Sequence, residues 1–598
     1  MCGIAGVYAH SSSAPAVNRE ELCAMRDHMI ARGPDGSGKW IRQDNRAALA
    51  HRRLSIIDLS DRAAQPMASA DGQLVISFNG EIYNYRALRS ELQSLGRVFK
   101  TESDTEVLLQ LYEHFGETML TKLRGMFAFA LWDGRKRAML LARDAFGIKP
   151  LYYADDGKTL RLASQVKALL QAPVDTRPEP AGHVGFFLWG SVPGPWTLYR
   201  GIKSLPPGHF MWTDPHGSRA PQAYCDITGI LAHAAQAPAQ GNEEAALQAI
   251  SNALHDSLAA HQVADVPVGI FLSAGLDSAM LCAMVASAGL RPRTVTLGFA
   301  EYAGTANDEV PLAEAVARQL KTEHTTTIVR RADFEGETER LLNAMDQPSI
   351  DGVNTWFVAR AAAQQGLKVA LSGLGGDELF ASYPSFRDLP RILRVARPLS
   401  RVPGLGMIAR KLSAPLLRHF TSPKYAGLIE YGGSTGGAYL LRRGLYMPWE
   451  LPQLMDPDMA RQGWQDLRPL AQLDEVAQRI PGRPGNRLAV SALEMSFYMR
   501  HQLLNDADWA GMAHSLEIRV PLVDVPLLQS VAPQLAAHPS LSKPRIAAAA
   551  APQLPHALLK KPKSGFSVPV RDWLSSRLPT RTRGLRGWAQ LMHARYAA

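Results

Sequence analysis

Cys2 is the first residue of this sequence whose chemistry depends on its position. Once Met1 is removed, Cys2 is the N-terminal residue. Its thiolate is then a nucleophile, and its own α-amino group, with a pKa of about 8, is the adjacent base. Taken alone, a small residue in a frayed chain end is the better interpretation. The prediction of a nucleophile therefore depends on the residues that surround it.

A second candidate is the small-residue segment 273–278, Ser-Ala-Gly-Leu-Asp-Ser, which follows the apolar run 266–272. A turn of this kind between a strand and a helix exposes backbone N–H groups, and the helix dipole favours an anion there. The segment resembles the PP-loop, SGGxDS, of enzymes that split ATP into AMP and pyrophosphate. Ala274 stands at a glycine position of that motif, which is tolerable if its φ is negative.

The elements that must position these residues follow two patterns. Up to residue 210, short strand-like runs are interleaved with segments of helical spacing, among them 74–80, 84–96, 104–115, 126–132 and 138–143. From about residue 245, β-branched apolar runs alternate with helical patterns, which predicts a parallel, doubly wound sheet. The predicted strands are 266–272, 293–299, 323–329 and 367–372, and the predicted helices include 309–320, 333–345 and 356–365.

The composition is that of a globular enzyme of two to four domains, with 598 residues, 46% hydrophobic and 20% charged. Four scattered cysteines exclude a disulfide framework or a zinc site. No apolar run reaches the roughly 18 residues of a membrane span, and the N-terminus lacks a secretory signal. We therefore expect a cytoplasmic enzyme without an integral membrane segment.

The net charge of +10 is concentrated late in the chain, with +8 over 387–424 and +10 over 543–598. The rest of the chain sums to −8. Neither patch contains a nucleic-acid recognition motif, so we expect no nucleic-acid partner. A solvated helix face is the preferred interpretation of 387–424, and contact with an anionic acceptor or a membrane surface is the alternative.

Seven blocks in order make residues 1–210 similar to the class II glutamine amidotransferases. They are MCGIAG (1–6), RGPDGSG (32–38), HRRLSIIDLS (51–60), FNGEIYNY (78–85), SDTE (103–106), GMFAFALWD (125–133) and RDAFGIKPLYY (143–153). The resemblance implies an N-terminal-nucleophile αββα sandwich in which Cys2 attacks the amide of glutamine.

The resemblance also assigns roles to the polar residues of these blocks. Arg53 matches the residue that binds the glutamine carboxylate, whereas Asp104 and the Gly80–Glu81 segment match the positions that bind its ammonium group. The Asn79 side chain and the Gly80 N–H match the oxyanion hole. Asn-Gly is also a strong hairpin signal, and both interpretations can hold.

Three further blocks resemble the synthetase half of the asparagine synthetases. They are SGLGGDELF (372–380), ADWAGMAHSLEIRVPLVD (507–524) and KKPKSGFSVP (560–569). Lys563 matches a catalytic lysine that stabilises the adenylation transition state. Asp277 and Asp377 match the carboxylates that hold Mg²⁺ against pyrophosphate. The expected ATP-binding residues are Leu272, Ser273, Gly275, Asp277, Ser278, Leu297, Ser372 and Gly373.

Together the halves resemble glutamine-hydrolysing asparagine synthetase over nearly the whole chain. The implied domains are a glutaminase at 1–211, a Pro-, Ala-, Gly- and Gln-rich linker at 212–242, and an ATP-dependent synthetase at 243–598 with a helical insertion at about 385–490. The implied substrates are glutamine, ATP and a carboxylate such as aspartate, which is adenylated and then amidated by channelled ammonia. A homodimer is also implied by the family.

The departures from the family pattern cluster where the acceptor should bind. Leu374 occupies a position that is usually acidic, Trp509 replaces an arginine, and 346–355 differs from the common form. We therefore keep a second hypothesis, that the acceptor is another carboxylate, such as a uronic acid of a surface glycan or a natural-product intermediate. A glutaminase with an inactive synthetase half, or a cyclising relative that needs no ammonia, is disfavoured because both sets of site residues are present.

Overall fold

Two antiparallel sheets lie face to face in the first third of the chain. The computed structural model describes residues 2–420, 422–561, 569, 573 and 585–597. The first sheet has the order β10-β8-β9-β1-β3-β2 and the second β12-β11-β7-β6-β5-β4, with β13 paired to β11. The first comprises β1 (Gly3–Ala9), β2 (Gly36–Ile41), β3 (Ala47–Arg53), β8 (Tyr152–Asp155), β9 (Thr159–Ala163) and β10 (Lys203–Ser204). The second comprises β4 (Met67–Ala68), β5 (Leu74–Ile82), β6 (Gly125–Asp133), β7 (Ala138–Arg143), β11 (His209–Asp214), β12 (Gly217–Ser218) and β13 (Gln222–Ala223).

Helices cover the outer faces of both sheets, which completes the predicted αββα sandwich. Side chains from both sheets, such as Ile4 and Leu141, fill the core between them. The helices α1 (Arg19–His28) and α4 (Val166–Leu169) pack on the first sheet, and α2 (Tyr85–Ser94) and α3 (Asp104–Phe115) cover the second. The Ser103 hydroxyl accepts a hydrogen bond from the Thr105 N–H at the start of α3, so Asp104 is the first helical residue rather than the cap.

The second half contains the predicted parallel sheet, with strand order β16-β15-β14-β17-β18 and every pair parallel. Its strands are β14 (Val268–Phe271), β15 (Arg293–Phe299), β16 (Glu323–Val329), β17 (Val369–Leu371) and β18 (Glu517–Arg519). The helices around it are α7 (Glu243–His261), α8 (Leu276–Ser287), α9 (Val310–Gln319), α10 (Arg331–Ala344), α11 (Val353–Gln364), α12 (Gly376–Leu379), α20 (Leu504–Met512), α21 (Val525–Ala537), α22 (Lys543–Ala550) and α23 (His556–Lys560). Because β14 and β17 are parallel neighbours, the two predicted loops leave the same edge of the sheet.

The linker expected over 212–242 is folded in the structure. Strand β11 pairs with β7 through residues 210–213, and β12 and β13 pair with β11 in turn. The helix α6 (Ile227–Gln236) then buries Ile227 and Leu231 in a core that includes Leu527 of α21. The Pro- and Gly-rich composition suggested a linker because strands as short as two residues leave almost no periodic signal.

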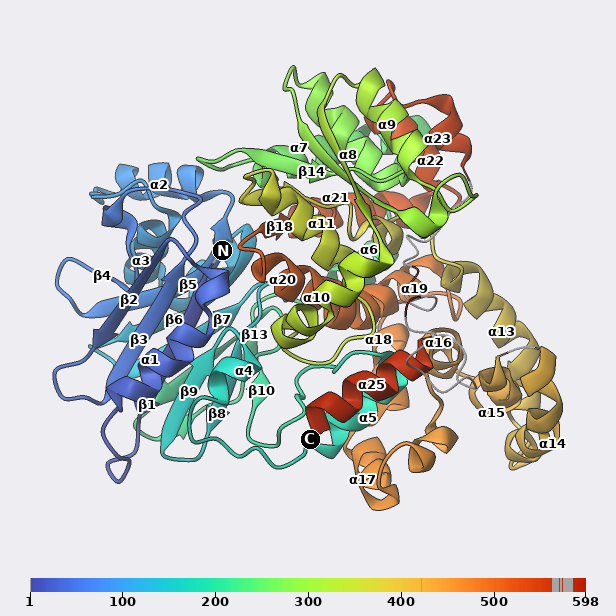
Figure 1. The fold of residues 1–598 in the computed structure, drawn as a ribbon, viewed down its shortest axis with the longest axis horizontal. Coiled ribbons are helices and arrows are strands. Elements are labelled where there is room, and N and C mark those ends of the chain that lie inside the picture. Colours follow the sequence, from blue (N-terminus) through green and yellow to red (C-terminus); the bar gives the residue numbers. More distant parts are fainter. Residues whose placement is uncertain (1, 421, 562–568, 570–572, 574–584, 598) are drawn as a thin grey trace.

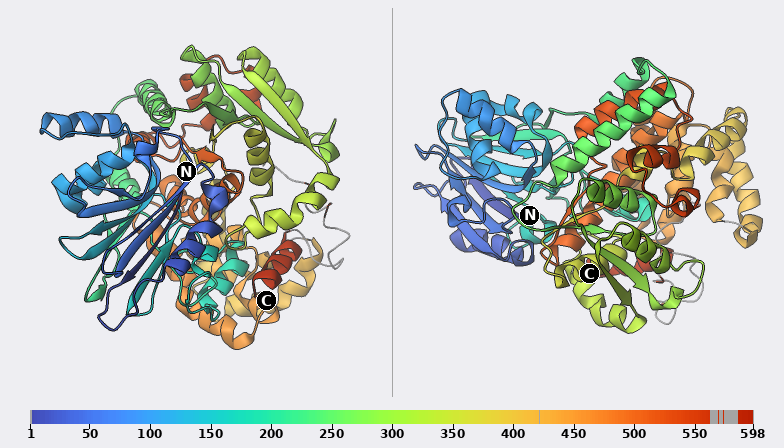
Figure 2. Two further views of the ribbon diagram at one scale, coloured as in Figure 1. Left: turned by 60° about the vertical axis from the view of Figure 1, so that its left-hand side comes forward. Right: turned by 90° about the horizontal axis from the view of Figure 1, so that it is seen from above.

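The remaining helices extend the second half away from the glutaminase sandwich (Figure 1). They are α5 (Pro180–Trp189), α13 (Ser385–Leu399), α14 (Leu405–Phe420), α15 (Leu428–Tyr431), α16 (Thr435–Arg443), α17 (Pro457–Leu467), α18 (Pro469–Gln478), α19 (Arg487–Leu493) and α25 (Arg586–Ala597), and a π-helical segment covers Glu494–Leu503. Figure 2, seen from above, places α13–α15 at the opposite end of the molecule from the N-terminal strands. No helix of the described ranges is long and apolar enough to cross a membrane.

Candidate active sites

Cys2 lies directly before β1, and its side chain faces the interior. Only 7% of the residue is exposed. Its backbone N–H donates a hydrogen bond to Asn79 Oδ1 at 2.9 Å. Burial raises the pKa of the Cys2 thiol, while a hydrogen bond from the Leu54 backbone and the charge of Arg53 oppose this rise. A thiol in this position requires a neighbouring base, and the α-amino group of a processed Cys2 is the nearest candidate.

Asn79 presents the donor that an oxyanion needs. The side chain is fully buried in β5, and its Nδ2 has no hydrogen-bond partner among the described residues. A buried amide donor without a partner costs free energy unless a ligand accepts its hydrogen bond. Because Oδ1 is held by Cys2, Nδ2 is oriented within the same site. This arrangement suits a negative charge that develops on a carbonyl attacked by Cys2.

Only glycine fits at position 80 of this strand. Its φ is +154°, and an added Cβ would lie 2.1 Å from the carbonyl oxygen of Met126. Gly80 and Asn79 pair with Phe127 and Ala128 in the middle of the β5–β6 ladder. The hairpin-turn interpretation of Asn79-Gly80 is therefore wrong, because the dipeptide lies inside a strand.

Two charged residues predicted to bind glutamine, Arg53 and Glu81, lie close to Cys2. Arg53 and Glu81 are both near enough for their charges to act on the Cys2 thiol, and Asp104 acts on Glu81 in the same way. Arg53 is held in place by donating to the backbone carbonyl oxygens of Ser60, at 2.9 Å, and Asp58. The sandwich thus brings Arg53 and Glu81 close to Cys2, with Asp104 close to Glu81.

Asp104 is a buried carboxyl whose pKa is raised to about 6, chiefly by burial. Its Oδ2 accepts a hydrogen bond from the Ile82 N–H at 3.1 Å, which partly opposes this rise. Burial likewise raises the pKa of Glu81, and Glu517 adds to the effect. An ammonium ligand would stabilise the charged form of both carboxyls.

The predicted PP-loop connects β14 to α8 and is held by its two serines. The Ser273 N–H and side chain both contact the Ser278 hydroxyl, at 3.1 and 3.0 Å, and the Gly275 N–H donates to Ser273 Oγ at 3.1 Å. Ala274 is absent from the described residues with positive φ, which explains how alanine fits at a glycine position of the motif.

The second loop packs tightly against the PP-loop. An added Cβ at Gly373 would lie 2.7 Å from Asp277 Cβ, and one at Gly376 would lie 2.2 Å from Asp277 Oδ1. The absence of side chains at these glycines therefore lets the two loops approach. As a result, Asp277 and Asp377 both accept hydrogen bonds from a single ammonium group, the Nζ of Lys543.

Lys543 was missed by the sequence reasoning. It begins α22 and its Nζ lies 2.5 Å from Asp377 Oδ1. No motif marks the residue, and only the path of the chain brings it to the loops. Lys563, the lysine predicted for this role, lies outside the described residues.

All eight predicted ATP-binding residues line one cavity of about 310 Å³, together with Asp377 and Leu374. The cavity walls are tied to the sheet, since the Leu272 N–H donates to Val295 O at 2.9 Å and the Ser372 N–H donates to Arg519 O at 2.8 Å. Carboxylate oxygens next to a phosphate-binding loop are the donors that Mg²⁺ prefers. The buried Asp277 Oδ1, which has no hydrogen-bond partner among the described residues, fits such a cation.

Two carboxyl groups that the sequence reasoning also missed, Asp351 and Asp506, line the same cavity near Leu374. Burial and the charge of Asp351 raise the pKa of Asp506 well above its ordinary value. The indole N–H of Trp509 donates a hydrogen bond to Asp506 Oδ1 at 2.7 Å. The tryptophan that replaces the arginine of the family pattern therefore orients the Asp506 carboxyl group. The acceptor region thus retains acidic groups although position 374 is apolar.

One buried arginine connects the two halves. Arg32 Nε donates to the Cys2 carbonyl oxygen at 3.1 Å, and its two terminal nitrogens donate to Asp508 at 2.7 and 3.0 Å. Asp508 lies on α20, the helix that carries Asp506 into the ATP cavity. A small cavity of about 30 Å³ beside this contact is lined from both halves, by Arg32 and Tyr152 and by Asp506 among others.

Comparison with known proteins agrees with this architecture. Residues 1–225 match the family model of the glutamine amidotransferase domain, and residues 249–587 match that of asparagine synthase. An asparagine synthetase [glutamine-hydrolyzing] 1 of Bacillus subtilis is 31% identical over 592 residues, covering 97% of this chain and 88% of that protein. A putative asparagine synthetase [glutamine-hydrolyzing] of Mycobacterium tuberculosis is 33% identical over 610 residues, covering 96% and 88%.

The two halves thus define a glutamine-dependent ligase, a class that joins an amidotransferase domain to a synthetase domain. The chain belongs to the asparagine synthase family.

Proposed function

We propose that this protein is a glutamine-hydrolysing asparagine synthase, which converts aspartate, glutamine and ATP into asparagine, glutamate, AMP and pyrophosphate. The observation that carries the proposal is the contact through Arg32, because it joins the Cys2 site to the helix that lines the ATP cavity. A glutaminase and an ATP site joined in this way are suited to passing ammonia from one to the other.

The first half-reaction uses the buried amide site. Cys2 attacks the side-chain carbonyl of glutamine, and its proton passes to the α-amino group of the processed chain. The oxyanion accepts hydrogen bonds from Asn79 Nδ2 and the Gly80 N–H. Arg53 binds the substrate carboxylate, and Asp104 and Glu81 bind its ammonium group. As the intermediate collapses, the α-amino group returns this proton to the leaving nitrogen, so ammonia is expelled and a thioester remains, which water hydrolyses to glutamate.

The second half-reaction takes place in the 310 Å³ cavity. The acceptor carboxylate attacks the α-phosphorus of ATP, and the bond to pyrophosphate breaks. The PP-loop N–H groups and Lys543 stabilise the departing charge, and Lys563 is proposed for the same role. Asp277 and Asp377 would hold Mg²⁺, which neutralises phosphate charge when bound. Ammonia then attacks the acyl-adenylate, its proton passes to a nearby carboxylate, and AMP leaves.

Asp351 and Asp506 support an acceptor that carries an ammonium group, as aspartate does. Leu374 supports the second candidate, an acceptor carboxylate other than aspartate, because an apolar side chain cannot bind an amine. The experiment is to incubate purified enzyme with ATP, Mg²⁺ and glutamine and to measure AMP release with aspartate and with a panel of uronic and other carboxylic acids. Asparagine formation that depends on aspartate would support the first candidate. AMP release with another acid but not with aspartate would overturn it.

We further propose that the enzyme acts in the cytoplasm and forms a homodimer, as the family resemblance implies. Size-exclusion chromatography with light scattering measures the second property directly, and a mass of one chain at micromolar concentration would contradict it.

A further inference from the structure

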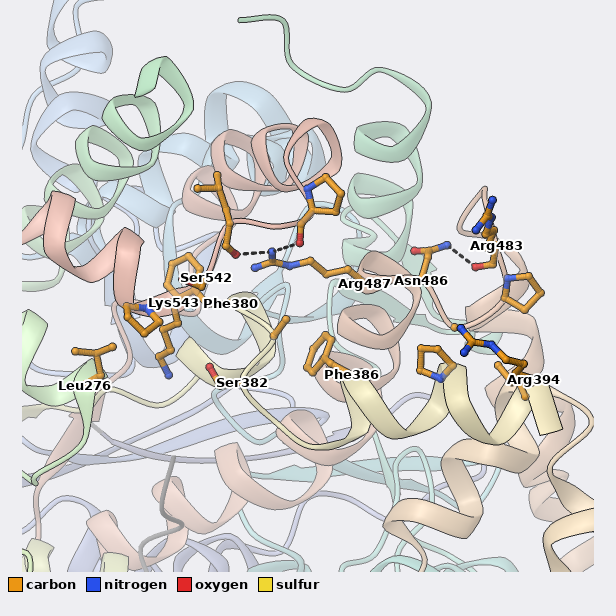
Figure 3. Close-up of a pocket in the computed structure, with 18 of the residues that line it drawn as sticks. Leu276, Phe380, Ser382, Phe386, Arg394, Arg483, Asn486, Arg487, Ser542 and Lys543 are labelled. Atoms are coloured by element: carbon orange, nitrogen blue, oxygen red, sulfur yellow. Dashed lines mark hydrogen bonds between the residues drawn. The ribbon is translucent and has the colours of Figure 1, made fainter. Parts of the chain in front are cut away.

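A second, larger cavity lies next to the PP-loop, with a volume of about 1020 Å³. It meets the ATP cavity at Gly275 and Asp277, which line both. From there it extends along α13 and the segment before α19, in the helical insertion. Figure 3 shows Lys543 and Leu276 at one end and Arg394 and Arg483 at the other, with Arg487 between them. We refer to this cavity as the basic cleft.

The basic cleft has a large excess of positive charge. Among its described lining residues only one is a carboxylate, Asp277. Seven are cationic, namely Arg394, Arg397, Arg401, Arg483, Arg487, Lys543 and Lys561. Lys543 and Lys561 form hydrogen bonds with groups around the PP-loop. By contrast, no carboxylate of the described residues lies within ion-pair distance of any of the five arginines. Within the described part of the chain, the charge of these arginines is therefore not balanced by carboxylates, which suits an anionic ligand.

Arg487 has hydrogen-bond donors that an anion in the cleft could satisfy. Its Nη1 donates to the carbonyl oxygens of Pro539 and Leu541, at 3.0 and 2.7 Å. Its Nε and Nη2 are buried without a hydrogen-bond partner among the described residues, and burial lowers its pKa to about 10. Arg487 as a residue is half-buried, but these two donor atoms are buried, and buried donors without a partner are costly unless an anion accepts their hydrogen bonds.

Three arginines at the C-terminal end of α13 line the cleft together. Arg394 and Arg397 are three residues apart, which places them on one face of the helix, and Arg401 follows just after the helix ends at Leu399. Several guanidinium groups suit more than one phosphate group, because each guanidinium can bind two phosphate oxygens at once. The cleft is thus suited to an anion with several phosphate groups or to a phosphate joined to a larger body.

We propose that the basic cleft is a second anion-binding site of the synthetase half and that it binds pyrophosphate-type ligands. One source is the pyrophosphate released at Asp277 and Asp377, an assignment that rests on the proposed function. The other source is a phosphate headgroup of a lipid, because Val395 and Leu399, on the neighbouring face of α13, are 59% and 43% exposed.

The test is calorimetric titration of the full chain with inorganic pyrophosphate, in the presence of Mg²⁺ and a saturating non-hydrolysable ATP analogue that fills the PP-loop. We expect one pyrophosphate to bind. The variant R394Q/R397Q/R401Q, which changes only exposed side chains, should bind it about tenfold or more weakly. Arg391→Gln is the matched control, because Arg391 is on the same helix but does not line the cleft. Equal affinity of the triple variant and the wild type would overturn the proposal.

A second arm tests the lipid source by sedimentation with phosphatidylglycerol and phosphatidylcholine vesicles. Selective binding to phosphatidylglycerol that the triple variant loses assigns a lipid headgroup to the cleft. Vesicle binding that the triple variant retains, without pyrophosphate binding, contradicts the proposal, as does binding of neither ligand. AMP release by the wild type is measured in parallel. If it is absent with every acceptor, the proposed function fails, whereas the titration still decides the role of the cleft.

Discussion

The two active sites are built in opposite ways. The glutamine site is enclosed between sheets, with Asn79 fully buried and Asp104 at the buried start of a helix. The ATP site is made of loops at a sheet edge and is continuous with a cleft of about 1020 Å³. A small, single substrate is suited to a closed site, whereas a nucleotide, an acceptor and a leaving group require an open one. The comparison predicts that each site can be disabled separately.

The largest expected effect comes from Cys2→Ala. Glutamine-dependent amide formation should fall by roughly 10⁴-fold or more, because no other group replaces the nucleophile. Activity with ammonium chloride should remain, since the ATP cavity is unchanged. Glutamate and AMP are measured separately with each nitrogen source. Equal loss with glutamine and with ammonia would contradict two separable sites.

The next largest losses of activity are expected from two variants, one in each half of the chain. Asn79→Ala should lower kcat for glutamine hydrolysis by roughly 10²–10³-fold, the usual cost of one oxyanion donor, and spare ammonia-dependent AMP release. Lys543→Met should do the reverse, lowering AMP release by a similar factor while glutaminase activity continues. Circular dichroism checks the fold of both. If both variants lowered both activities, the separation of the sites would be refuted.

A pH profile tests the closed site. The pKa of Asp104 is about 6, above the ordinary value for aspartate, so the group gains its proton as the pH falls through 6. The KM for glutamine should then rise by about tenfold per pH unit below 6, because the neutral acid no longer attracts the substrate ammonium group. In the double variant Asp104→Asn/Glu81→Gln the KM should be high and flat across this range, because Glu81 is a second buried carboxyl with a raised pKa at this site. A slope that persists in this variant would assign the pH dependence to another group.

The smallest effect is expected at the contact between the sites. Asp508→Asn keeps a hydrogen-bond acceptor for Arg32 but removes the charge. Each half-reaction should retain its rate within a few-fold, while the glutamate formed per AMP rises above one as ammonia escapes. Asp458→Asn on the exposed surface of α17 is the control. An unchanged ratio would mean that this contact plays no part in ammonia transfer.

Elements with a strong periodic signal were predicted well from the sequence. Strands β7, β15 and β16 have the predicted bounds, and the residues of the two loops were found because glycines and acids recur in a fixed order. The sequence did not reveal the roles of Lys543, Asp351 and Asp506, because their proximity to the loops depends on how distant elements pack. The folded segment after residue 211 was missed for a related reason, since two-residue strands carry too little pattern.

The path of the chain through α6 limits how this enzyme can be divided. Strands β11, β12 and β13 extend a glutaminase sheet, and α6 begins within a few residues of the end of β13 and buries Ile227 and Leu231 beside α21. The two halves are thus not joined by a loose segment, and one continuous apolar core contains residues of both. Exchange of the glutaminase half for that of a relative would therefore expose apolar surface on each piece. A hybrid should keep α6 together with the helices it covers, and heating the intact chain should give one calorimetric transition rather than two.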